Sequence, residues 1–315
     1  MVFKNPEAIT RIASIGGGPI GGGWTAHFLA RGYDVVSYLH DPAEADAFRE
    51  IVDTAWISLE ALGLEKGASR DRLTITSDLA QAVEMAEFVQ ESAPENLGLK
   101  QALYKQLGNL VPETVVISSS TSGLTMTEIQ ADCATPERTV VGHPFNPPYL
   151  LPLVEIVGGD KTSRDAISWA RDFYQVAGKA PLVLNKEIPG FIATRLQEAL
   201  WREALHMVAN GEATAEQIDT ALINGPAPRM AMFGQCMAFH IACGEGGMAT
   251  NLDQFGPALK LPWTRLEAPE LTKALRDRMV YGCDEMAAGR RFEELAAERD
   301  RGIVAVLKGV RAARA

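Results

Sequence analysis

The sequence predicts an α/β protein in which a doubly wound parallel sheet is followed by an all-α C-terminal domain. Three observations support this fold class. Short apolar runs alternate with amphipathic stretches before residue 187, as they do in βαβ units. A glycine-rich loop directly follows the first apolar run, and the pattern from Phe191 onward is helical. A chain of 315 residues also suits two domains of roughly 150 residues each.

Five runs in the first half have the length and apolar character of buried strands. In chain order, the expected strands are Ile12–Ile15, Asp34–Leu39, Phe88–Glu91, Val115–Ser118 and Thr139–Gly142. Helices are expected over Thr25–Arg31, continuing a helix that begins in the glycines before it, and over Phe48–Leu62. Because strands and helices alternate, we expect the strands to form one parallel sheet.

The second half changes character near Ile188-Pro189-Gly190, and we place the domain boundary at 187/188. Helices are expected over Phe191–Asn210, Thr214–Asn224, Leu271–Ala288 and Phe292–Val310. Thr214 followed by Gln217 has the form of a capping box, and Gly211 suits the end of the preceding helix. Residues 188–315 therefore form the expected helical domain.

The composition excludes several classes of protein. Apolar residues make up 47% and charged residues 22%, which is ordinary for a globular chain. A formal charge of −10 argues against a general nucleic-acid binder. No uninterrupted apolar run of about 18 residues exists, and the N-terminus lacks the profile of a signal peptide. We expect a cytoplasmic protein with no membrane or nucleic-acid partner.

Four cysteines are too few for a disulfide scaffold of this length. They stand at Cys133, Cys236, Cys243 and Cys283, without a C-x-x-C pair. We interpret them as reduced thiols rather than as ligands, so no metal site is expected.

The glycine-rich loop has the form of a dinucleotide-binding motif. Gly16, Gly18 and Gly21 fit the pattern G-x-G-x-x-G between an expected strand and an expected helix. The first glycine permits the tight turn, the second lets the backbone approach a pyrophosphate, and the third lets the helix pack on the strand. The helix N-terminus at Pro19 and Ile20 faces the anion, and the residues after Pro19, which has no N–H of its own, supply free N–H groups. The loop therefore predicts a Rossmann-type domain over residues 1–187, the alternative being a merely flexible glycine loop.

The acidic residue that should follow the second strand is missing from its usual position. In dinucleotide-binding folds an acid about 20 residues on binds the ribose hydroxyls, yet this position holds Leu39. The nearest acid, Asp41, could reach the ribose from the loop or could be an ordinary solvated aspartate beside Pro42. No arginine stands at positions 39–42 to accept a 2′-phosphate, so we expect NAD rather than NADP as cofactor.

A histidine and a glutamate form the candidate catalytic pair. His143 follows the apolar run 139–142, at the carboxyl end of an expected strand, where open α/β sheets hold their chemistry. Oxidation of an alcohol requires a base for the hydroxyl proton, and imidazole suits that role. Glu155 would orient the imidazole if the strand after the proline-rich loop runs back beside His143. The alternative is a structural histidine and an ordinary strand glutamate.

Four motifs occur in order along the chain: the glycine loop, ESAPEN at 91–96, SSSTSG at 118–123, and HPFNP at 143–147 with a glutamate twelve residues after its histidine. This combination resembles the 3-hydroxyacyl-CoA dehydrogenase superfamily over nearly the whole chain. Within it, QESAPENLGLK, ALWREAL, LPWTRL and DEMAAGR are similar to the L-carnitine dehydrogenase branch. L-gulonate 3-dehydrogenase and lens lambda-crystallin form the nearest other branch.

The resemblance implies a role for each matching position. His143 would be the general acid/base, Glu155 would hold it, and Ser122 would bind the reacting oxygen. Asn146 would line the site and help position the nicotinamide or the substrate. Two further positions match the cofactor side, near nicotinamide and ribose: Glu95 and Lys100.

One position departs from the superfamily pattern in the helix after the linker. Thr194 stands where an asparagine usually contacts the substrate oxygen. Its hydroxyl can still donate one hydrogen bond. The carnitine branch also departs from asparagine here, so the change is consistent with that branch.

Carnitine combines a carboxylate with a quaternary ammonium, which aromatic faces attract by about 0.5–2 kcal/mol per ring. Candidate rings are Trp201, Phe233, Phe239 and Trp263, and candidate partners for the carboxylate are Arg195, Arg202 and Arg229. The ordinary alternatives are a helix-core role for Trp201 and a surface role for the arginines.

Two pocket positions differ from the carnitine branch. There, a tryptophan usually follows the arginine at 229 and a tyrosine stands near position 239, whereas this chain has Met230 and Phe239. The pocket could therefore accept another 3-hydroxy acid or bind carnitine weakly.

Taken with the resemblance, these residues predict an NAD-dependent oxidoreductase that oxidises the 3-hydroxyl of a small acid, L-carnitine to 3-dehydrocarnitine. We expect a homodimer in which residues 188–315 complete the site and form the interface. The alternatives are a 3-hydroxyacyl-CoA thioester or L-gulonate as substrate, and a catalytically idle NAD-binding protein. Basic residues at 66–72 that could bind CoA phosphates are interleaved with acids, and retention of the candidate catalytic residues argues against an idle protein.

Overall fold

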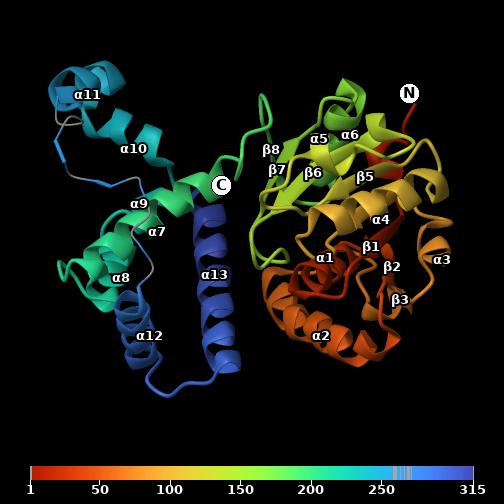
Figure 1. Cartoon of the computed structure of the whole chain (residues 1–315), viewed down its shortest axis with the longest axis horizontal. Coiled ribbons are helices and arrows are strands. Elements are labelled where there is room, and N and C mark those ends of the chain that lie inside the picture. Colours follow the sequence, from red (N-terminus) through yellow and green to blue (C-terminus); the bar gives the residue numbers. More distant parts are fainter. Residues whose placement is uncertain are drawn as a thin grey trace. The chain divides into compact units, whose positions relative to one another are not determined.

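The structure is a computed structural model of the chain, and it describes residues 2–314 except 258–260, 263, 266, 268, 269 and 271. Two compact units, Met1–Thr194 and Arg195–Ala315, divide the chain (Figure 1). The first unit holds the sheet and the second consists of helices. The α/β class with a helical C-terminal part is therefore confirmed.

The first unit is built on one sheet with the strand order β3-β2-β1-β4-β5-β6-β7-β8. Its strands are β1 (Arg11–Ile15), β2 (Asp34–Tyr38), β3 (Leu73–Thr76), β4 (Phe88–Glu91), β5 (Val116–Ser119), β6 (Thr139–Pro144), β7 (Leu153–Val157) and β8 (Ala180–Val183). Neighbouring strands run parallel except β6 and β7, which are antiparallel. The order reverses between β1 and β4, so the carboxyl ends of these strands flank the crevice in which such sheets bind ligands.

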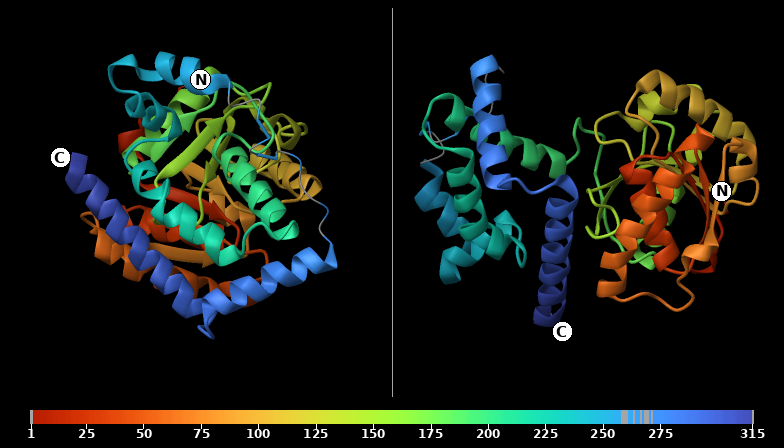
Figure 2. Two further views of the ribbon diagram at one scale, coloured as in Figure 1. Left: turned by 90° about the vertical axis from the view of Figure 1, so that its left-hand side faces the viewer. Right: turned by 90° about the horizontal axis from the view of Figure 1, so that it is seen from below.

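Helices cover both faces of this sheet (Figure 1, Figure 2). The helices are α1 (Pro19–Ala30), α2 (Ala45–Leu62), α3 (Leu79–Val83), α4 (Leu97–Leu110), α5 (Met126–Ile129) and α6 (Arg164–Val176). One core packs α1, α2 and α6 on the sheet, and a second core packs α3, α4 and α5 on its other face. Neighbouring strand residues alternate between the cores: Val116 belongs to the first and Ile117 to the second.

The second unit is helical throughout its described part. Its helices are α7 (Ala193–Ala209), which begins at the boundary, α8 (Ala215–Asn224), α9 (Ala227–Met230), α10 (Gln235–Ala242), α11 (Gly247–Phe255), α12 (Lys273–Ala287) and α13 (Phe292–Arg314). The capping box is confirmed, since the Gln217 amide donates to Thr214 Oγ1 at 3.2 Å and the Thr214 amide donates to Gln217 Oε1 at 3.0 Å. Gly211 has φ +70° just after α7, in the left-handed region that suits a helix end.

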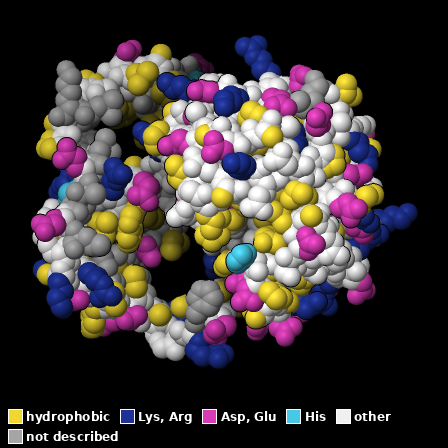
Figure 3. Space-filling view, turned by 45° about the vertical axis from the view of Figure 1, so that its right-hand side comes forward, with side chains coloured by type: hydrophobic (Ala, Val, Ile, Leu, Met, Phe, Trp, Pro, Cys, Tyr) yellow, Lys and Arg dark blue, Asp and Glu magenta, His cyan; other side chains and the backbone are white. Residues whose placement is uncertain are grey.

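Surface and membrane features are unremarkable in the described residues. None of the described helices is both long and apolar enough to cross a membrane. Figure 3 shows acidic and basic side chains interspersed over the face in view, with no patch of a single sign. The four cysteines are free thiols.

Candidate active site

The glycine loop between β1 and α1 has the shape that a dinucleotide requires. Gly16 has φ +123°, and a Cβ there would lie 2.4 Å from the Ser92 carbonyl oxygen. A Cβ on Gly21 would lie 2.0 Å from the Gly16 carbonyl oxygen, so neither position tolerates a side chain. A Cβ on Gly18 would meet nothing within 4 Å, which leaves the backbone open to a ligand. The loop therefore fits a bound pyrophosphate.

The N-terminus of α1 begins at this open side of the loop. Gly18 is the N-cap residue and supplies no side-chain cap, and Pro19 opens the helix with Ile20 next. The first N–H groups of a helix have no intrahelical acceptors, so they remain available to an anion.

After β2, where dinucleotide-binding folds usually place the acid that binds the ribose, this chain has a buried leucine and an exposed aspartate. Leu39 is fully buried, and its amide donates to the Thr76 carbonyl oxygen at 3.0 Å. Asp41 is exposed, and its Oδ1 accepts a hydrogen bond from the Ala43 amide at 2.9 Å. The Asp41 carboxylate thus caps the short turn Pro42–Glu44.

His143 and Glu155 face each other across the antiparallel pair β6 and β7. The strand register pairs the two residues directly, and His143 Nδ1 lies 3.0 Å from Glu155 Oε2. Glu155 is fully buried and His143 is 6% exposed. The expectation that the strand after the proline-rich loop returns beside His143 is confirmed.

The other carboxylate oxygen of Glu155 is held by the start of α7. Glu155 Oε1 accepts hydrogen bonds from the Ile192 and Ala193 amides, both at 2.9 Å. Burial alone would raise the pKa of Glu155, but hydrogen bonds from His143, Ala193 and Ile192 outweigh it and hold the pKa below its usual value. An ionised carboxylate only accepts, so Nδ1 of His143 carries the proton of this hydrogen bond, and in the neutral imidazole Nε2 is the acceptor nitrogen.

Two aromatic rings flank the imidazole. The ring centroids of Phe145 and Phe191 lie 5.4 Å and 5.3 Å from that of His143. Phe191 is buried and has φ +50°, an unusual conformation for a residue with a side chain. Sequence reasoning missed both rings, although Pro189-Gly190 marked the sharp turn that directs Phe191 inward.

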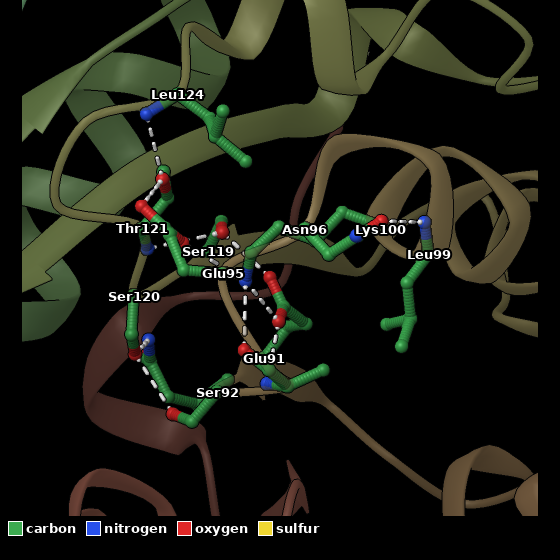
Figure 4. A network of polar contacts seen from close by, with 12 residues as sticks. Glu91, Ser92, Glu95, Asn96, Leu99, Lys100, Ser119, Ser120, Thr121 and Leu124 are labelled. Carbon is green, nitrogen blue, oxygen red and sulfur yellow. Dashed lines mark hydrogen bonds and ion pairs between the residues drawn. The ribbon is translucent and has the colours of Figure 1, made fainter.

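Glu95 ties down the loop after β5, which contains Thr121 (Figure 4) and the next residue, Ser122. Its Oε1 accepts hydrogen bonds from Thr121 Oγ1 at 2.7 Å, the Ser122 amide at 3.0 Å and the Gly123 amide at 3.1 Å. Ser122 Oγ lies 3.4 Å from the same oxygen, and Ser122 is exposed. Burial would raise the pKa of Glu95, but the Thr121 hydrogen bond, the Lys100 charge and the two amides lower it overall.

Lys100 lies inside the protein beneath this loop. Its Nζ donates to Glu91 Oε1 at 2.6 Å and to the Ala93 carbonyl oxygen at 3.1 Å, and it lies 3.7 Å from Glu95 Oε2. Lys100 is 1% exposed and Glu91 is fully buried. Sequence reasoning missed Glu91 as part of the site, although an acid that ends a buried strand was a usable signal.

The remaining predicted residues are divided between the two units. Asn146 is exposed in the loop after β6, and Thr194 is half-buried in the first turn of α7. The second unit contains the other candidates: Arg195, Trp201 and Arg202 on α7, Arg229 and Met230 on α9, Phe233 in the next turn and Phe239 on α10.

The three candidate aromatic rings that the structure describes in the second unit make no contact with one another. Trp201, Phe233 and Phe239 are 47%, 48% and 43% exposed, and no ring contact joins them in the described part of the unit. Trp263 lies outside the described residues. The three described rings therefore do not enclose a cation by themselves within the second unit.

Comparison with known families identifies the class of protein. Residues 11–188 match the model of the 3-hydroxyacyl-CoA dehydrogenase NAD binding domain, and residues 190–282 match the model of the C-terminal domain of the same family. The chain belongs to the 3-hydroxyacyl-CoA dehydrogenase family. It is an NAD-dependent oxidoreductase of that family, and the glycine loop described above lies in its NAD-binding part.

The relatives of this chain include L-carnitine dehydrogenases. An L-carnitine dehydrogenase of Streptomyces coelicolor is 58% identical over 306 residues, covering 97% of this chain and 96% of the relative. One from Nocardiopsis dassonvillei is 57% identical over 305 residues, covering 97% and 93%. The crystal structure of 5-formyl-3-hydroxy-2-methylpyridine 4-carboxylic acid 5-dehydrogenase, an NAD+-dependent dismutase, has a TM-score of 0.81 at 30% identity, covering 96% of this chain and 99% of that chain.

Proposed function

We propose that this protein oxidises the 3-hydroxyl of L-carnitine to 3-dehydrocarnitine with NAD, and that His143 is the general base. The observation that carries the proposal is the buried His143–Glu155 pair, whose carboxylate accepts hydrogen bonds on both oxygens. The substrate is proposed from the L-carnitine dehydrogenases that are 57–58% identical over nearly the whole chain.

In the proposed reaction the substrate loses a proton from its hydroxyl and a hydride from C3. Bound NAD supplies the hydride acceptor, and the C3–O bond becomes a carbonyl. His143 takes the proton at Nε2, and the Glu155 carboxylate stabilises the imidazolium that forms. Ser122 donates a hydrogen bond to the reacting oxygen, and Thr194 supplies a second donor for it.

Other residues are proposed to hold the two ligands. The cofactor pyrophosphate binds the loop and helix N-terminus formed by Gly16, Gly18, Pro19, Ile20 and Gly21. Glu95 and Lys100 support the Ser122 loop on the nicotinamide side, and Asn146 lines the same side. The substrate ammonium and carboxylate are assigned to the second unit: Arg195, Trp201, Arg229, Met230, Phe233 and Phe239.

We further propose a cytoplasmic homodimer. Apolar side chains on α7 are exposed, with Leu196 65% and Leu200 53% accessible. Such a face is costly to leave in water and suits an interface with a second copy. Free cysteines suit a reducing compartment. Light scattering of the purified protein in solution should give a mass twice that of one chain, and a mass equal to one chain would refute the dimer.

The experiment that tests the proposed function measures NADH formation with a panel of alcohols. L-carnitine, D-carnitine, L-gulonate and 3-hydroxybutyryl-CoA are each supplied with NAD or NADP. The proposal predicts turnover of L-carnitine with NAD and its loss in His143→Ala. Activity only on another 3-hydroxy acid would refute carnitine and direct attention to Met230 and Phe239. Inactivity on all four with NADH still bound would favour the idle-protein alternative.

A further inference from the structure

The ribose site of this chain lacks the acid that dinucleotide folds place after the second strand. That position is Leu39, whose side chain is fully buried and has no polar atom to offer. The next acid, Asp41, uses its carboxylate to cap the Ala43 amide. One oxygen of the Asp41 carboxylate is thus committed, so an acid that lies against the glycine loop itself is the stronger candidate for the ribose.

Glu44 reaches this loop. It ends the short turn Pro42–Glu44 directly before α2. Its Oε2 lies 2.8 Å from the position that a Cβ on Gly17 would occupy, and Leu39 Cδ2 lies 3.1 Å from the same point. The Glu44 carboxylate thus rests against the glycine loop beside the residue that replaces the usual acid.

The Glu44 carboxylate is also chemically available. It accepts no hydrogen bond and makes no ion pair with any residue in the described part of the chain, and the residue is exposed. Gly17 precedes Gly18, the glycine left open to a ligand. A free carboxylate at this edge of the loop can accept hydrogen bonds from two neighbouring hydroxyls of a ribose.

We propose that Glu44 binds the adenosine ribose of NAD and selects against NADP. The carboxylate accepts from the 2′- and 3′-hydroxyls and repels a 2′-phosphate, which is doubly charged or nearly so. The inference deepens the proposed function by naming a residue that determines cofactor specificity. It rests on NAD binding and not on the identity of the alcohol.

The test measures equilibrium binding of NADH and NADPH to the full chain by fluorescence, without any alcohol present. Glu44→Gln keeps the shape and removes the charge. Glu50→Gln, an exposed glutamate further along α2, is the matched control, and Asp41→Asn tests the rival acid. Competition by ADP-ribose, which lacks nicotinamide, assigns any change to the adenosine half. Thermal unfolding of each variant checks that the fold is retained.

We expect Glu44→Gln to weaken NADH and ADP-ribose binding by about 10- to 100-fold, the range for loss of charge-assisted hydrogen bonds. The preference for NADH over NADPH should fall by at least about tenfold, with Glu50→Gln unchanged. NADH binding within about twofold of wild type in Glu44→Gln would overturn the inference, as would a loss confined to Asp41→Asn. Because this assay contains no alcohol, neither result bears on the proposal that L-carnitine is the substrate.

Discussion

Replacing Glu155 with glutamine separates the charge of this residue from its shape. Two backbone amides, those of Ile192 and Ala193, donate to Oε1, so the glutamine oxygen must take that place. The amide nitrogen then faces His143 Nδ1 and can only donate a hydrogen bond. Nδ1 must become the acceptor, which moves the imidazole proton to Nε2. The nitrogen proposed to take the substrate proton is then already protonated.

The distance between His143 Nδ1 and Glu155 Oε2 sets the size of the expected fall in kcat. At 3.0 Å and an effective dielectric of about 20, a carboxylate attracts an imidazolium by about 5.5 kcal/mol. A charge-assisted hydrogen bond alone contributes about 3 kcal/mol at most. At about 1.4 kcal/mol per tenfold, these values bracket a fall in kcat of about 10²- to 10⁴-fold.

Initial rates of NADH formation with saturating L-carnitine measure this effect. Binding of NADH to Glu155→Gln should stay near the wild-type value, because Glu155 contacts no part of the glycine loop. Glu187→Gln is the matched control, since Glu187 accepts hydrogen bonds from Thr127 and has no contact with His143. A fall in kcat of less than about fivefold in Glu155→Gln would refute the assigned role of the pair.

Three further predictions concern stability and cofactor binding. Gly21→Ala places a methyl group 2.0 Å from the Gly16 carbonyl oxygen, so it should lower the free energy of unfolding by about 1–3 kcal/mol and weaken NADH binding. Gly309→Ala is the control, because its methyl group meets nothing within 4 Å and should cause neither loss. Lys100→Met leaves the buried Glu91 carboxylate without its cation, so the free energy of unfolding in urea should fall by about 3–5 kcal/mol. This loss should largely disappear in the double variant with Glu91→Gln, and fully additive losses would contradict the pairing. Burial lowers the pKa of Lys179 from 10.5 to about 7. The unfolded chain therefore binds more protons between these values, and stability should rise with pH there; urea unfolding should show this rise in wild type and a smaller one in Lys179→Met, and equal slopes would contradict it.

Features that depend on a few consecutive residues could be predicted from the sequence. The glycine loop is one example, because the tight turn and the close approach of Gly21 to Gly16 are local requirements. The strand Phe88–Glu91 and the capping box at Thr214 are others, since burial and capping leave short-range patterns. Five of the eight strands of the first unit also follow from the alternation of apolar and amphipathic stretches.

Features that depend on distant contacts could not be predicted. β3 was missed because it lies at the sheet edge, where Leu73–Thr76 are only partly buried and carry a weak apolar signal. Phe191 reaches His143 only because the chain crosses from β8 to α7 at this point. The resemblance assigned Lys100 to the cofactor side, but its burial and its ion pair with Glu91 depend on the fold and could not be predicted. In the second unit, helical periodicity identifies apolar faces but does not say which ring contacts a substrate.

The most direct test of the central claim follows the hydrogen at C3 of the substrate. L-carnitine carrying deuterium at C3 is oxidised with NAD, and the NADH formed is analysed by mass spectrometry. The account predicts one deuterium in each NADH and a slower rate with the labelled substrate, since the C3 hydrogen leaves as hydride while His143 takes the hydroxyl proton. NADH without deuterium, or no NADH from L-carnitine at all, would contradict it.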